Sequence, residues 1–257
     1  MKKRSAIKIF FSVVYALLMR EITTRFGSQK LGYLWAIIEP MAMIVIFSII
    51  HSKMNTKVSY DMSVFLATSF VSYNLFKDIV LRNLETFSAN KGLFVYKQVK
   101  PFDAIISRMI LEFVLQCFVV IVLLIIGYYV GVDMKVKDLL SVLLAVLWFV
   151  LFGFGLAVLF AVLSYFFENF AKIARLIFLP MFFISGLFFS ADSLPPQIRE
   201  ILLLNPVFQF EEMIHGFYFY ALDDRYVNYI YLIFWTLIPM FLGLWLYKKT
   251  ERKIIMT

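Results

Sequence analysis

The sequence predicts an all-α integral membrane protein. Of its 257 residues, 62% are hydrophobic and only 16% are charged, whereas about 25% of the residues in an ordinary soluble domain are charged. The apolar residues also gather in runs of about 20, the length that carries an α-helix across a ~30 Å hydrocarbon core. Transmembrane strands would instead appear as alternating segments of about 10 residues. The composition therefore excludes a soluble globular domain and favours membrane-spanning helices.

Six apolar runs predict six transmembrane helices. The second run is the weakest, because Lys77 and Asp78 lie near its end and must reach the interface or pair with a neighbour. In the fourth run, Gly153, Ala157 and Ala161 lie four residues apart, which indicates close helix packing. The predicted spans cover residues 31–50, 62–81, 104–130, 139–164, 173–190 and 228–247.

The stretch before the first span predicts a helix that lies on the membrane surface. The apolar core within residues 8–20 is too short to cross, and its apolar positions recur at helical spacing beside a basic flank. These positions include Ile7, Phe11, Val14 and Leu18. A secretory signal peptide is the alternative, since residues 2–4 are basic, but no small-residue cleavage site follows them. We therefore favour a retained surface helix.

The distribution of Lys and Arg predicts that both termini are cytoplasmic. The segments on one side of the predicted spans carry seventeen basic residues, and those on the other side carry six. Basic residues concentrate on the cytoplasmic side of a membrane. The formal charge of +8 is mostly this asymmetry, so it gives poor support for a nucleic-acid partner, and none is expected.

Two connections between spans carry more sequence than a simple helical bundle needs. Residues 191–227 contain two amphipathic pieces separated by Asn205-Pro206, which predict two short external helices that re-enter the membrane. Purely interfacial helices fit the same composition equally well. Glu211, Glu212 and His215 would lie at the mouth of a pathway in the first case and among lipid headgroups in the second.

The loop of residues 82–103 is basic and has aromatic residues spaced along it. Aromatic anchors within a polar rim are typical of a protein interface, so a short helix here would suit docking to a soluble partner. A loop that lies along the membrane is the alternative. The aromatic residues are Phe87, Phe94, Tyr96 and Phe102.

Glu39-Pro40 is the most informative pair within a predicted span. A carboxylate at membrane depth costs about 2.5–3.5 kcal/mol on insertion scales, so it favours a face that borders protein or water. Trp35 lies one turn away and Tyr33 precedes it, which together would offer a translocation pathway a polar group and stacking surfaces. The alternative is that Glu39 pairs with Arg108, which also has Glu112 at i,i+4.

The sequence lacks the motifs of a catalytic site. Gly27 and Gly32 have the spacing of a P-loop, but Tyr33-Leu34 replace the Lys and Ser/Thr that hold phosphate and Mg²⁺. His51 and His215 lack the spacing of a metal site, and no GxSxG motif is present. Composition leaves open a transporter subunit powered by another chain, a proton-coupled secondary transporter and a membrane enzyme. The second lacks its usual sign of inverted repeats.

Three segments resemble a known family. REITTRFGSQKLGYLWAIIEP, residues 20–40, resembles the entry to the first span in ABC-2-type polysaccharide export permeases. NKGLFVYKQVKPFDAIISR, residues 90–108, and the stretch of residues 185–219 are similar to capsular polysaccharide export permeases of the KpsM and BexB kind. Permeases for O-antigen or teichoic-acid-type glycans share the first motif and are the alternative.

The resemblance implies a single ABC-2-type transmembrane domain over residues 1–257. It implies a homodimer in the bacterial inner membrane, bound to two copies of a cytoplasmic ABC ATPase that holds ATP and Mg²⁺, with no cofactor in this chain. The substrate would be a lipid-linked polysaccharide, passed to periplasmic and outer-membrane export proteins.

The resemblance also assigns roles to segments. The family's interfacial helix corresponds to residues 5–25, its coupling helix to residues 86–95, and its external gate helices to residues 195–220. The residues implied in coupling to the ATPase are Asn90, Lys91, Phe94 and Tyr96. Those implied in the external gate are Asn205, Pro206, Glu211, Glu212 and His215.

Overall fold

The computed structural model describes residues 6–26, 38, 41–47, 49–50 and 60–256, and throughout these residues the regular secondary structure is helical. The prediction of an all-α protein is confirmed to that extent. The elements are α1 (Ala6–Phe26), α3 (Met62–Asn83), α4 (Thr86–Asn90), η1 (Lys91–Leu93), α5 (Pro101–Val130), α6 (Leu139–Phe166), α7 (Phe170–Ile184), η2 (Ala191–Ser193), α8 (Pro196–Leu202), α9 (Pro206–Tyr218) and α10 (Tyr229–Met256).

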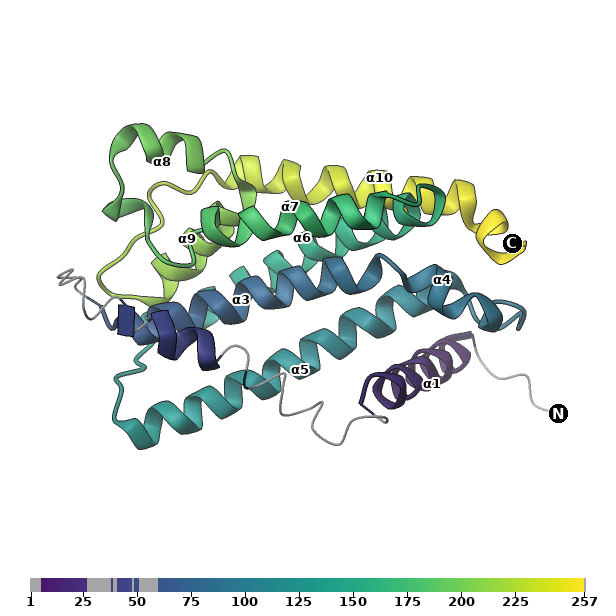
Figure 1. Cartoon of the computed structure of the whole chain (residues 1–257), viewed down its shortest axis with the longest axis horizontal. Coiled ribbons are helices and arrows are strands. Elements are labelled where there is room, and N and C mark those ends of the chain that lie inside the picture. The colour runs from purple at the N-terminus through teal and green to yellow at the C-terminus, as the bar shows by residue number, and fades with distance from the viewer. Residues whose placement is uncertain (1–5, 27–37, 39–40, 48, 51–59, 257) are drawn as a thin grey trace.

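The helices α3, α5, α6, α7 and α10 run lengthwise beside one another, and consecutive ones alternate in direction (Figure 1). The short helices α8 and α9 lie at one end of this bundle. The helix α4 and the final turns of α10 lie at the other end, and α1 packs beside α5 (Figure 1). The two unusual connections of the sequence therefore lie at opposite ends, here called the α9 end and the α4 end.

Four of the described helices, α3, α5, α6 and α10, are long and apolar enough to cross a membrane. The fifth predicted span is helical only from Phe170 to Ile184, about 22 Å at ~1.5 Å per residue. It ends just before Gly186, whose φ of 80° breaks the helix. Most of the first predicted span lies outside the described residues, although residues 41–47 are helical. The count of six spans stays a prediction.

Side chains at the helix starts explain where several helices begin. Asp61 accepts hydrogen bonds from the backbone N–H groups of Ser63 (2.8 Å) and Val64 (3.3 Å) at the start of α3. Such N-caps satisfy donors that have no partner within the helix. Helix α5 begins at Pro101, three residues before the predicted span, because proline fits the first turn and Asp103 accepts from the Lys100 N–H (3.0 Å).

Stacked aromatic rings hold α9 inside the bundle. Phe149 of α6 lies between Phe76 of α3 and Phe210 of α9, with ring centroids 4.7 and 4.9 Å apart. All three side chains are buried. Since buried aromatic pairs add to the stabilisation from burial itself, this stack fixes α9 against both long helices.

Small residues bring α6 close to its neighbours. A Cβ added at Gly153 would lie 3.2 Å from the ring of Phe76 in α3, and Ala157 is fully buried beside the same helix. The predicted packing role of Gly153 and Ala157 is confirmed. On another face, a Cβ at Gly243 of α10 would lie 2.8 Å from the backbone nitrogen of Leu159, so α6 and α10 touch backbone to backbone.

Candidate functional site

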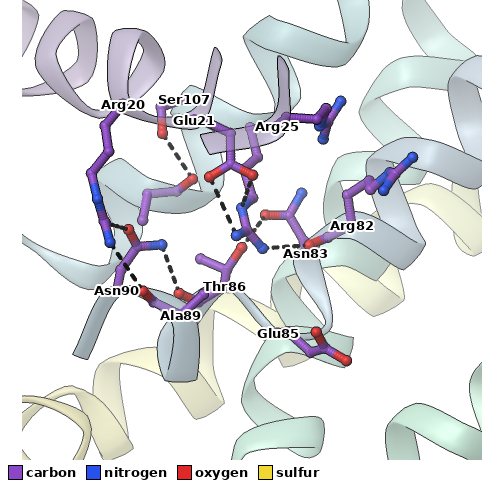
Figure 2. Close-up of polar contacts among 12 residues, drawn as sticks. Arg20, Glu21, Arg25, Arg82, Asn83, Glu85, Thr86, Ala89, Asn90 and Ser107 are labelled. Atoms are coloured by element: carbon purple, nitrogen blue, oxygen red, sulfur yellow. Dashed lines mark hydrogen bonds and ion pairs between the residues drawn. The ribbon is translucent and has the colours of Figure 1, made fainter. Parts of the chain in front are cut away.

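A polar network at the α4 end joins α1 to the end of α3, to α4 and to α5. We call it the α4 network. Figure 2 shows polar side chains and backbone groups from these separate helices converging on one small region. Its members are Arg20, Glu21, Arg25, Arg82, Asn83, Thr86, Ala89, Asn90, Arg108 and Glu112.

The break between α3 and α4 is built from local hydrogen bonds. The Asn83 side chain donates to the carbonyl of Ile79 (2.8 Å) and accepts from the hydroxyl of Thr86 (3.0 Å). The Asn90 amide then donates to the carbonyl of Thr86 (2.9 Å). Since Asn83, Thr86 and Asn90 are all buried, these bonds fix α4 firmly to the end of α3.

Helix α1 is tied directly to α4. The guanidinium of Arg20 donates to Asn90 Oδ1 (2.5 Å) and to the carbonyl of Ala89 (3.5 Å), and Figure 2 shows Arg20 reaching across to both. The predicted surface helix and the predicted coupling helix therefore share a polar contact. The buried face of α1 packs through Val13 and Leu17 into the apolar cluster that contains Phe94.

Two ion pairs tie α1 to α5. Arg108 of α5 pairs with Glu21 (Nε to Oε1, 3.1 Å) and donates to the carbonyl of Arg82 (2.6 Å). Arg25 pairs with Glu112 (2.5 Å). Although Glu112 stands four residues after Arg108 in the same helix, each of these two residues pairs with a residue of α1 instead.

The predicted coupling residues divide into two groups. Asn90 and Phe94 are buried, Asn90 in the α4 network and Phe94 in the apolar cluster with Val13 and Leu17. Lys91 is exposed, and Tyr96 is 64% exposed. The role of all four in coupling stays a prediction, but only Lys91 and Tyr96 offer surface for a direct contact.

The predicted pathway residues Tyr33, Trp35 and Glu39 lie outside the described residues. Their role stays a prediction. The alternative that Glu39 pairs with Arg108 likewise stays a prediction.

The predicted external gate residues lie in and before α9. Asn205 caps this helix, since its side chain accepts from the Val207 N–H (3.0 Å) and donates to the Ser185 hydroxyl (3.0 Å). Pro206 occupies the first helical position. The two short helices on either side of Asn205 match the two amphipathic pieces of the sequence, whereas their depth in a membrane stays a prediction.

The ionisable residues of α9 are buried within the chain, and their place at a pathway mouth or among lipid headgroups stays a prediction. Glu211, Glu212 and His215 are each exposed by 4% or less. The hydroxyl of Ser72 in α3 donates to Glu211 Oε2 (2.7 Å), and Ser69 Oγ lies 2.8 Å from His215 Nε2. We call these five residues the α9 cluster.

Burial shifts the protonation of this cluster. Removal from water raises the pKa of Glu211 and of Glu212 and lowers the pKa of His215, because each charged form loses hydration. A hydrogen bond from the Ala191 N–H to Glu212 Oε1 (2.8 Å) only partly opposes the rise for Glu212. Within the described part of the chain, no group of side chains is arranged to hold a metal ion.

Sequence reasoning missed several members of both sites. Ser69 and Ser72 are ordinary residues of a span, and nothing local marks them as partners of α9. Arg20, Glu21 and Arg25 carry a signal in hindsight, because their charges follow the apolar face of α1 and oppose the charges at the start of α5.

Comparisons with known proteins agree with the resemblance. The profile of the ABC-2 type transporter family matches residues 12–219. The chain is 33% identical over 254 residues to the polysialic acid transport protein KpsM of Escherichia coli, covering 98% of both chains. It is 29% identical over 238 residues to the capsule polysaccharide export inner-membrane protein CtrC of Neisseria meningitidis serogroup A, covering 90% of this chain and 88% of the relative. It is 28% identical over 260 residues to the capsule polysaccharide export inner-membrane protein BexB of Haemophilus influenzae, covering 98% and 96%.

Proposed function

Since the chain belongs to the ABC-2 type transporter family, we propose that it is the transmembrane subunit of an ATP-driven exporter that moves capsular polysaccharide, a lipid-linked glycan, across the inner membrane. The observation that carries this proposal is likeness over almost the entire length to relatives named for polysialic acid transport and capsule polysaccharide export. The chain contributes the membrane pathway, and a separate ATPase subunit binds ATP and Mg²⁺.

In the proposed assembly two copies of the chain surround one pathway, and two ATPase subunits bind at the α4 end. The exposed side chains of Lys91, Val95 and Tyr96 support this site, since Val95 and Tyr96 are 80% and 64% exposed at one connection. The α4 network supports a mechanical role, because polar side-chain contacts join α4 to α1 and α1 to α5. Movement of α4 would therefore be passed to α5.

The α9 end faces the periplasm in this proposal, and α8 and α9 form its gate. Both termini are cytoplasmic, and periplasmic and outer-membrane export proteins receive the glycan. The pathway is lined by the first span, where Tyr33, Trp35 and Glu39 offer stacking surfaces and a polar group. Cysteines placed at positions 35 and 39 should react with a water-soluble reagent in the assembled complex, and a cysteine in place of Ile44 should not.

Reconstitution tests the function. Proteoliposomes that contain this chain and its ATPase subunit should move lipid-linked capsular glycan when ATP and Mg²⁺ are supplied, and this chain alone should neither hydrolyse ATP nor move glycan. An ATPase subunit unable to hydrolyse ATP is the control. Glycan movement by this chain alone under a proton gradient would instead support a secondary transporter and overturn the proposal.

A further inference from the structure

Helix α9 carries three buried ionisable side chains, and each of them has an uncharged group as its hydrogen-bond partner. Glu211 and His215 are fully buried, and Glu212 is 4% exposed. Their hydrogen-bond partners are the neutral hydroxyls of Ser72 and Ser69 and the backbone N–H of Ala191. Burying a charge is costly unless it is paired, so the protonation of this cluster is tied to the burial of α9.

Two polar atoms of the cluster are left without a hydrogen bond. The hydroxyl of Ser69 lies 2.8 Å both from the carbonyl oxygen of Phe65 and from His215 Nε2, which donates or accepts according to the tautomer of the imidazole. Among the described residues, His215 Nδ1 and Glu211 Oε1 are buried and have no hydrogen-bond partner. The carboxyl and imidazole face each other at 3.9 Å, from Oε2 to Nε2.

The charged groups around the cluster do not neutralise it. Asp192 and Asp223 lie near Glu212 and disfavour its ionised form, although Arg225 pairs with both of these carboxylates. Lys137 donates to the carbonyls of Gly216 (3.0 Å) and Leu222 at the end of α9 rather than to a carboxylate of the cluster.

The remaining contacts of α9 are uncharged. Helix α3 presents the hydroxyls of Ser69 and Ser72 and, near Glu211, that of Tyr73. Tyr60 lies near Glu212. Helix α6 presents the aromatic rings that stack on Phe210, and the start of α10 meets α9 through the Asn228 N–H, which donates to Gln209.

A buried carboxyl and imidazole side by side tolerate only a net charge of zero. They reach it either as a neutral acid beside a neutral imidazole or as an ion pair, and both arrangements contain the same single proton. The docked Glu211–His215 pair therefore holds one proton over a wide pH range. Glu212 holds a second one, since burial raises its pKa to about 8.

We propose that α9 is a proton-linked latch, which takes up protons when it docks against α3 and releases them when it undocks. The latch consists of the Ser72–Glu211 and Ser69–His215 contacts together with the Glu212–Ala191 contact. Nothing in it depends on glycan or ATP, so the inference goes beyond the proposed function and stands or falls separately.

The direction of the pH effect follows from proton counts. When α9 undocks, Glu212 returns to its ordinary pKa near 4.5 and loses its proton. The Glu211–His215 pair keeps one proton below the ordinary histidine pKa of about 6.5 and loses it above. Docking thus takes up one proton between about pH 4.5 and 6.5 and two between about 6.5 and 8. Because the docked state binds more protons, it weakens as pH rises.

Thiol accessibility measures how the undocking of α9 depends on pH. The experiment uses the full chain, reconstituted in lipid nanodiscs without glycan or ATP. In a Cys117→Ser background, Met213→Cys places a thiol where the native side chain is buried on α9, and Tyr220→Cys places one just beyond α9 where the native side chain is 73% exposed. The maleimide reaction rate at position 213 is divided by the rate at position 220, so that the pH dependence of the thiol chemistry itself cancels. The ratio should rise about tenfold per pH unit from pH 5 to 6.5 and more steeply from 6.5 to 8.

Substitutions then assign the protons. Each of the substitutions Glu212→Gln and Glu211→Gln removes one proton from the docking equilibrium, so each should take a factor of about ten per pH unit out of the rise of the ratio. Glu200 is an exposed glutamate on the neighbouring helix α8, and Glu200→Gln should leave the rise unchanged. A ratio that stays constant from pH 5 to 8 with native Glu211, Glu212 and His215 overturns the proposal, whether or not the variants fold. A full slope that persists in the Glu211→Gln, Glu212→Gln double variant also overturns it.

Discussion

At the scale of single residues, Arg108 connects three helices. Its guanidinium pairs with Glu21 of α1 and donates to the carbonyl of Arg82 at the end of α3, while its own backbone belongs to α5. A buried cation that loses a partner leaves a charge uncompensated, which costs more than the pair itself contributes. Arg108 is thus a structural centre of the α4 network.

Glu21→Gln should therefore lower the stability of the protein by about 1–3 kcal/mol, measured by thermal or chemical unfolding in detergent. Exchanging the charges, with Arg at position 21 and Glu at position 108, should restore little of this loss, because a carboxylate at position 108 would face the carbonyl of Arg82. Full recovery in the exchanged variant would show that the ion pair alone matters. Glu168→Gln, at an exposed position, is the matched control.

The two aromatic residues of the predicted coupling segment should behave differently. Phe94 is 3% exposed and Tyr96 is 64% exposed. Phe94→Ala should destabilise the protein by about 3 kcal/mol, as expected for a buried ring. Tyr96→Ala should leave stability unchanged and weaken co-purification of the ATPase subunit. Equal effects of both substitutions on stability would contradict this division.

The sequence alone indicated that the loop of residues 82–103 has aromatic anchors, but not which of them face outward. A short helix held by buried bonds from Asn83, Thr86 and Asn90 turns Phe87 and Phe94 into the core. Likewise, Arg108 and Glu112 match an i,i+4 pair in the sequence. Such pairs contribute only about 0.2–0.5 kcal/mol, so partners on α1 prevail. Contacts between distant segments are what local patterns omit.

At the scale of helices, the closest contact is between α6 and α10. Gly155 and Gly243 remove the side chains that would otherwise separate the two backbones, and a Cβ at Gly155 would lie 3.0 Å from the backbone nitrogen of Met240. Backbone atoms cannot swing aside as a flexible side chain can. The pair therefore depends on the absence of a methyl group at two positions.

Gly243→Ala should destabilise the protein by about 1–3 kcal/mol because its methyl group would overpack this contact. Gly92→Ala is the control, since a Cβ at Gly92 meets no atom within 4 Å. Thermal unfolding of both variants in the same detergent provides the comparison. A Gly243→Ala protein as stable as the control would mean that α6 and α10 can separate without cost.

Helix boundaries were predictable where a local signal exists. Span predictions that began at residues 62 and 139 agree with the starts of α3 and α6, which Asp61 and Asp138 cap. The predicted span of residues 173–190 ran six residues past the end of α7. Residues 185–190 are mostly apolar and so continue the hydrophobic pattern of the span, but the positive φ of Gly186 turns the chain out of the helix.

At the scale of the whole molecule, the start of α1 and the end of α10 lie toward the same end, together with α4 (Figure 1). This arrangement is the one that both termini on one side of a membrane would require. The distribution of basic residues over the predicted spans, seventeen against six, predicts that this side is the cytoplasmic one.

Cysteine labelling of intact cells tests this orientation in a Cys117→Ser background. Cysteines near Gln98 and Lys253 should be protected from a membrane-impermeant reagent, and a cysteine near Asp224 should react. Permeabilised cells, in which all three should react, provide the control. Reaction near Gln98 and protection near Asp224 would reverse the orientation.

The most extensive helix contact in the described structure, that of α6 with α10, also has a consequence in time. The ribosome completes α6 about 60 residues before α10 begins, which at roughly 5–20 residues per second is a delay of several seconds. During that interval the glycine face of α6 has no α10 to receive it. The nascent chain therefore exposes this face of α6 to the bilayer until α10 is made. A membrane insertase or chaperone that shields small-residue faces would bind there.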